Sequence, residues 1–170
     1  MQIKFSSTIT KKLNKNQIKQ ICLLKDTTWK YGIKSQINWF QNNVKNQDIH
    51  NLLYKKSKLI GYTLLKKRSC KINNLQKKTY LLFDTCLVRP EFRNQNFSKI
   101  LMNFNNIIIK KLNLFSFLIC NNNLIRFYNK FSWIKLNKKN ISISDHNFNS
   151  NGMVFNAKGK NKKYTFYIKK

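Results

Sequence analysis

The spacing of apolar residues divides the chain into predicted helices and strands. Residues 13–26 and 33–44 place apolar side chains three or four positions apart, which predicts two successive helices. Asn14 or Asn16 is the expected N-cap of the first helix. Shorter apolar runs predict strands at residues 2–7, 51–54, 59–67, 80–88, 153–156 and 164–168.

The region from Tyr80 to Trp133 has the most informative order of elements. Its first apolar run ends at Val88, and Pro90 marks the end of that strand. A polar loop follows, and apolar residues then recur at helical spacing: Phe97, Ile100, Leu101, Phe104 and Ile108. A loop that opens a helix in this way collects unpaired backbone N–H groups at the positive end of the helix dipole, which suits a pyrophosphate. Arg93, where the loop begins, adds a planar cationic donor.

A further strand and a short aromatic helix complete this region. The strand contains Leu118, and the helix carries an apolar stripe formed by Leu124, Phe127, Tyr128 and Phe131. The polar segments 69–78 and 137–151 are expected to be loops. Gly61, inside a predicted strand, indicates either a bulge or a close-packed site.

These residues resemble the acetyl-CoA-binding half of the GNAT N-acetyltransferase superfamily. In that family a strand ends in the loop V-x-P-x-x-R-G-x-G-x-G, and a later helix carries F-Y-x-x-x-G-F/W. The counterparts here are Val88, Pro90, Arg93 to Ser98, Phe127-Tyr128 and Ser132-Trp133. The resemblance implies an α/β (α+β) fold in one domain over residues 1–170. Its central sheet would be mixed, mostly antiparallel and twisted, flanked by helices, with splayed strands at the coenzyme cleft.

Several positions depart from the family pattern. Asn96 replaces a Gly, Ser98 replaces a Gly or Ala, and Ser132 replaces a Gly. Small residues in the loop let the backbone approach the phosphates and adopt positive φ. Asn is the non-glycine residue that best tolerates the left-handed region. We therefore expect the loop to close on a pyrophosphate still, at some cost in affinity.

The resemblance also implies which residues hold acetyl-CoA. The backbone of Leu87 and Val88 would pair with the pantetheine amides as an added strand, although an ordinary core strand is the alternative for both. Asn121 stands where the family often has an Asn that binds the coenzyme. The phosphates would contact the loop and the start of the helix, which comprise Arg93, Asn94, Gln95, Asn96, Phe97 and Ser98.

Two residues are candidates for acid–base chemistry. The resemblance implies that Tyr128 protonates the departing thiolate, whereas the alternative places it in the apolar stripe as a core residue. Asp84 interrupts an apolar strand, where acids are depleted, and is the candidate general base. The alternative for Asp84 is a solvent-facing or structural position. Asp26 and Glu91 are further candidates for the base.

The charge balance opens a second interpretation of the function. The chain has 34 Lys and Arg against 5 Asp and Glu, a formal charge of +29, and Glu91 is its only Glu. Codon bias in an AT-rich genome would raise Lys, Asn and Ile, but it should also raise Glu. A domain of this charge repels itself unless a polyanion compensates, so RNA or a ribonucleoprotein fits as a partner. The alternative to an amine acetyltransferase is a weakened or inactive protein of the same fold in a ribonucleoprotein such as an organellar ribosome.

Other features bound the cellular setting. No apolar stretch approaches the about 20 residues that span a bilayer, and no secretory signal or Arg-rich presequence is visible. We expect a location in the cytosol of an AT-rich bacterium, or inside an organelle with its own genome (mitochondrion or plastid). The four cysteines have no C-x-x-C spacing, and His50 and His146 have no ligand residues nearby, so we expect reduced core thiols and no metal.

Overall fold

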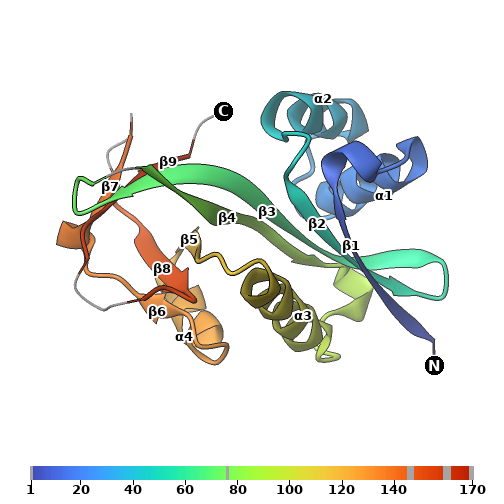
Figure 1. Cartoon of the computed structure of the whole chain (residues 1–170). Helices are drawn as coiled ribbons and strands as arrows, with labels where there is room; N and C mark the ends of the chain where they lie inside the picture. Colours follow the sequence, from blue (N-terminus) through green and yellow to red (C-terminus); the bar gives the residue numbers. More distant parts are fainter. Residues whose placement is uncertain (1, 76, 145–147, 159–161, 169–170) are drawn as a thin grey trace. The chain divides into compact units, whose positions relative to one another are not determined.

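The computed structural model describes residues 2–75, 77–144, 148–158 and 162–168 (Figure 1). The described strands form one mixed sheet, in which most neighbouring strands are antiparallel, while β4–β5 and β7–β9 are parallel. The main path of the sheet runs in the order β1 (Ile3–Ile9), β2 (Ile49–Lys55), β3 (Lys58–Ile72), β4 (Lys77–Val88), β5 (Ser116–Cys120), β8 (Asn151–Phe155) and β6 (Ile134–Lys135). Strand β9 (Tyr164–Tyr167) pairs with β3 and with β7 (Ile141–Ile143).

Among the described residues, four helices flank the sheet, and together with the strands they confirm the mixed fold expected from the sequence. They are α1 (Lys15–Asp26), α2 (Ile33–Asn43), α3 (Phe97–Lys111) and α4 (Asn122–Asn129). Asn14 caps α1, because its side chain accepts from the Gln17 N–H while the Gln17 side chain accepts from the Asn14 N–H. No described helix is long and apolar enough to cross a membrane.

The chain forms two compact units, and the first contains residues 2–66 and 85–105. Successive residues of β2 point to opposite faces of the sheet, so this unit has a core on each face. Leu52 packs with residues of α1 and α2, including Leu24 and Phe40. Its neighbour Leu53 packs on the other face with Leu101 of α3 and with other buried residues. In Figure 1, α1 and α2 accordingly lie on one side of β2 and α3 on the other.

Gly61 in β3 allows close packing in this first unit. It lies opposite Leu53, next to the register shift between Leu53 and Tyr54. A Cβ atom at Gly61 would lie 3.2 Å from Leu53 Cδ2 and 3.3 Å from Leu101 Cδ2. The bulge and the close approach expected as alternatives therefore occur together.

The second unit contains residues 67–84 and 106–168, and its core is largely aromatic. The rings of Phe117 and Phe166 stack with centroids 3.7 Å apart, and Tyr80 contacts both rings edge-on. Tyr80 is fully buried, and its hydroxyl has no hydrogen-bond partner among the described residues. Burial accordingly raises the pKa of this hydroxyl.

Two segments expected to be loops contain regular structure. Residues 69–72 continue β3, because Ser69 to Ile72 pair with β9, and β4 begins at Lys77. Residues 141–143 form β7, which pairs with β9. Both predictions were wrong for the same reason: these segments pair with the distant strand β9, and Cys70, Ile141 and Ile143 are buried in the core of this unit. Residues 145–147, within the second expected loop, lie outside the described residues.

Candidate functional site

The loop between β4 and α3 has the backbone conformation expected where the family motif has glycine, namely positive φ. A 3-10 turn, Pro90–Phe92, follows β4, and the chain then passes through Asn94 at φ 60° and Asn96 at φ 62°. Both residues occupy the left-handed region, which glycine adopts most easily and asparagine adopts best among the other residues. Asparagine thus supports the turn for which the family motif uses glycine.

The start of α3 presents backbone donors to the exterior. The N–H of Ile100 donates to Asn96 O, and the N–H groups of the first turn, which precede Ile100, have no partner within the helix. Asn94, Gln95 and Asn96 are exposed, Ser98 is half-buried, and Phe97 is buried and anchors the helix. The unpaired N–H groups and the helix dipole converge here, so the loop can hold an anion such as a pyrophosphate.

Arg93 is held at this loop by two contacts. Its Nε donates to Val88 O over 3.3 Å, and its Nη2 donates to Thr28 Oγ1 over 3.2 Å. A guanidinium carries five N–H groups, so donors remain for a phosphate. Sequence reasoning did not point to Thr28, because Thr28 precedes Arg93 by 65 residues.

Leu87 and Val88 contribute buried side chains at the end of β4. Val88 packs with Phe97 and Leu101 of α3, so its side chain belongs to the core of the first unit. The parallel ladder between β4 and β5 covers Leu81 and Leu82 and includes no later residue of the described strand. This early end of the ladder agrees with the expected splay of the two strands.

The carboxylates proposed as general bases lie in three different settings. Asp84 is exposed in the middle of β4. Asp26 accepts a hydrogen bond from the Gly32 N–H over 2.8 Å, which supports the turn into α2. Glu91 forms an exposed ion pair with Lys58 over 2.8 Å, and this hydrogen bond lowers the pKa of its carboxyl. Of the three, Asp84 remains the candidate base.

Tyr128 is half-buried on α4 and belongs to an aromatic cluster in the second unit. Its ring contacts Phe83 edge-on at 6.2 Å between centroids and lies 6.2 Å from the ring of Trp133. Trp133 is nearly fully buried, and its Nε1 donates to Asn106 Oδ1 over 3.1 Å. The Asn106 Nδ2 in turn donates to Phe131 O over 2.9 Å. Asn106, which the sequence did not single out, therefore fixes the segment that follows Tyr128.

Two further candidate residues lie at the ends of α4. Ser132 adopts φ 62°, so it occupies the left-handed position for which the family uses glycine. Asn121 is exposed at the N-cap of α4, and its side chain makes no capping hydrogen bond.

The structure assigns the candidate residues to two groups. Leu87, Val88 and residues 93–98 belong to the first unit, whereas Asp84, Asn121 and Tyr128 belong to the second.

The cysteines are free thiols in apolar surroundings. Cys22, Cys70 and Cys120 are buried, and Cys86 is half-buried. Burial raises the pKa of Cys22 to about 11 and that of Cys86 to about 12, which leaves both as protonated thiols at neutral pH. Among the described residues, no group of three or more His, Cys, Asp or Glu side chains could hold a metal ion.

Comparison with known proteins reveals similarity at the level of the fold. No protein-family model matches the sequence, and no curated protein matches it. An acyl-CoA N-acyltransferase from Pseudomonas aeruginosa superposes with a TM-score of 0.67 at 11% identity, covering 90% of this chain and 99% of the other. The PaiA N-acetyltransferase of Thermoplasma acidophilum, solved with coenzyme A, gives 0.55 at 19% identity over 91% and 98%. The ribosomal-protein-S18-alanine N-acetyltransferase of Escherichia coli gives 0.59 at 10% identity over 98% and 96%.

Proposed function

We propose, from the GNAT fold that this chain has, that it is an acetyl-CoA-dependent N-acetyltransferase acting on a primary amine. The observation that carries the proposal is the loop before α3. Asn94 and Asn96 stand in the left-handed region there, and the N–H groups of the first turn of α3 have no partner within the helix. A backbone of this shape is the feature that a pyrophosphate requires.

Further residues would complete the coenzyme site. The N–H groups of Gln95 to Ser98 would donate to the pyrophosphate, with Arg93 beside them as a permanent cation. The backbone of Leu87 and Val88 would extend the sheet along the pantetheine arm, and Asn121 would donate to the coenzyme. The side chains of Asn94 and Asn96 are larger than the single hydrogen atom of glycine. We therefore expect weaker coenzyme binding than a glycine loop would give.

Direct transfer in a ternary complex needs a base for the acceptor amine and an acid for the departing thiolate. The acceptor amine must be neutral when its lone pair attacks the thioester carbonyl, so a base or a water relay removes a proton. Asp84 is the proposed base. The C–N bond forms and the nitrogen loses its surplus proton, the C–S bond breaks, and the departing thiolate takes a proton from the hydroxyl of Tyr128, which is the proposed general acid.

The charge of the chain restricts the acceptor. Small polycationic acceptors need acidic pockets, and the chain has 5 Asp and Glu in total. An amine carried by an RNA-bound protein fits a domain of charge +29 better, because the RNA attracts the enzyme. One of the similar structures is named for acetylating an alanine of ribosomal protein S18. That precedent supports a protein acceptor of this kind.

A second candidate function rests on the same charge. With 34 basic residues and Glu91 as the only Glu, the chain suits a basic subunit of a ribonucleoprotein, such as an organellar ribosome. In that case the fold would be kept for its shape while coenzyme binding is weakened or lost. Either function is compatible with an AT-rich bacterial cytosol or with a mitochondrion or plastid.

Calorimetric titration with acetyl-CoA tests the proposal and separates the two candidates. The first predicts binding of one equivalent, which Arg93→Ala should weaken by roughly tenfold or more, because a hydrogen bond to a charged group is lost. Arg126→Ala, at an exposed position of α4, is the matched control and should bind like the parent. Circular dichroism checks that both variants are folded. If no binding heat is measured up to millimolar acetyl-CoA, the acetyltransferase function is refuted and the ribonucleoprotein function remains.

A further inference from the structure

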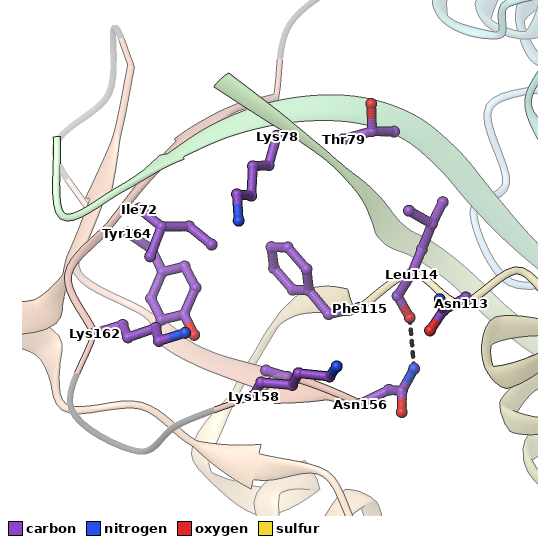
Figure 2. A pocket seen from close by; sticks show the side chains of 11 residues that line it. Ile72, Lys78, Thr79, Asn113, Leu114, Phe115, Asn156, Lys158, Lys162 and Tyr164 are labelled. Carbon is purple, nitrogen blue, oxygen red and sulfur yellow. Dashed lines mark hydrogen bonds between the residues drawn. The ribbon is translucent and has the colours of Figure 1, made fainter. Parts of the chain in front are cut away.

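The second unit contains a basic pocket that the proposed acetyl transfer does not use. Its volume is about 560 Å³, and five separate segments of this unit line it. Figure 2 shows the Phe115 ring amid side chains from these segments, with Lys78 above it in the view and Lys158 below. Pockets of this size hold ligands as large as a nucleotide.

Hydrogen bonds between the lining segments hold the walls of the pocket together. Asn156 Nδ2 donates to Leu114 O over 2.8 Å, the bond drawn in Figure 2. The segment before β9 is tied to the turn after β3, because the Asn73 N–H donates to Lys163 O over 2.8 Å and the Lys163 N–H donates to Asn73 Oδ1 over 2.9 Å. The pocket is therefore already formed without a ligand.

The charge of the lining is entirely positive. Lys78 and Lys158 are exposed and Lys162 is half-buried, and no carboxylate is among the described residues that line the pocket. Three ammonium groups around one cavity repel one another, and an anion with several oxygens relieves that repulsion.

The floor of the pocket is aromatic. Phe115 is half-buried, and its ring centroid lies 5.9 Å from that of Tyr164 and 5.8 Å from that of Tyr80. The stacked and tilted contacts fix the Phe115 ring, so its remaining surface is a rigid apolar face. Ammonium groups around such a face match a phosphorylated aromatic ligand better than they match a bare anion.

We propose that this pocket binds a nucleotide of single-stranded RNA. The base lies against Phe115, and Lys78, Lys158 and Lys162 contact the phosphates on either side of it. Unpaired bases can enter a recessed pocket and stack on an aromatic ring, whereas the bases of a duplex are stacked on each other. A membrane surface would need protruding aromatic and basic residues, and this ring lies inside a cavity. The proposal is independent of the acetyltransferase activity.

Fluorescence anisotropy with a labelled single-stranded oligouridine of about ten nucleotides, within the known range of site sizes, tests the proposal. The variant Lys78→Gln/Lys158→Gln/Lys162→Gln should weaken binding by at least tenfold. Its log–log salt slope, measured between about 50 and 200 mM salt, should be smaller by about 2, since each lost phosphate contact on a single strand removes about 0.7. Phe115→Leu keeps the charge and should weaken binding about tenfold through lost stacking.

The matched control is Lys11→Gln/Lys12→Gln/Lys15→Gln, which removes the same charge from exposed positions of the first unit. The affinity of this control for the oligouridine should fall less than that of the pocket variant. Equal losses in the two triple variants would overturn the proposal, because net charge alone would then explain the binding. Equal affinity for AMP would instead indicate a site for free nucleotides, and equal affinity for duplex RNA or anionic vesicles would exclude base stacking. Displacement of the oligouridine by equimolar acetyl-CoA would assign the pocket to the coenzyme and also overturn the proposal.

Discussion

His50 makes the stability of the first unit sensitive to acid. It is fully buried in β2, where its Nε2 lies 2.8 Å from Thr10 Oγ1 and its Nδ1 lies 2.8 Å from the hydroxyl of Tyr62. The rings of Phe40 and Tyr62 stack against it at 5.5 and 5.8 Å. Burial lowers the pKa of His50 to about 3, because the charged imidazolium would lose its hydration.

The sign and size of the effect follow from proton linkage. Below about pH 6.5 the unfolded chain binds a proton at this histidine while the folded chain does not, so the free energy of unfolding falls as the pH falls. The loss is roughly 1.4 kcal/mol per pH unit and continues down to the folded-state pKa of about 3. Between pH 7 and pH 4 it amounts to about 3 kcal/mol, a large part of the about 5–15 kcal/mol that stabilises a typical domain.

Urea denaturation at a series of pH values measures this loss. The chain has 5 Asp and Glu, so fewer carboxylates than usual compete with the histidine as the source of acid sensitivity. His50→Gln should flatten the profile between pH 7 and pH 4, and the carboxylate contribution remains in both proteins. An NMR titration of the His50 ring provides a test that does not depend on the variant folding. A stability that stays constant down to pH 4, or a ring that titrates near 6.5, would refute the reasoning.

Three further predictions concern single side chains. Asn96→Gly should keep or improve acetyl-CoA affinity in calorimetry, whereas Asn96→Val should abolish it, because φ 62° is strained for a β-branched residue; equal affinities would contradict this. Tyr128→Phe should lower kcat by about 10²–10⁴-fold with little change in the coenzyme Kd, and full activity would disprove its role as the acid. Tyr80→Phe should raise the free energy of unfolding by up to about 1–3 kcal/mol by removing an unpaired buried hydroxyl, whereas Tyr62→Phe, which loses the bond to His50, should lower it by about 1 kcal/mol. Urea denaturation compares the last two, and changes of the same sign would count against the explanation.

The elements that sequence reasoning predicted well are those determined by local residues. Pro90 ends β4, the apolar spacing from Phe97 defines α3, and Asn14 with Gln17 forms a capping box within four residues of chain. In each case the residues that predict the element lie within the element or next to it.

The features that escaped prediction depend on partners distant in sequence. β3 continues past residue 67 because β9, about 95 residues later, pairs with Ser69 to Ile72. Arg93 was predicted as a site residue, but its contact with Thr28 was not, because nothing in the Thr28 neighbourhood points to residue 93. The pairing of Asn106 with Trp133 was likewise hidden, because asparagine is so common in this chain that no single one stands out.

The asparagines in the left-handed region change what counts as a family signature. Of the eight described non-glycine residues with positive φ, six are asparagine, among them Asn94 and Asn96. A search pattern that asks for the letter G at these positions rejects the chain, although its backbone passes through the same region of φ. At this loop the chain adopts positive φ with asparagine at positions where the motif has glycine. Other asparagine-rich sequences should be searched with patterns that accept asparagine at the positions of left-handed glycines.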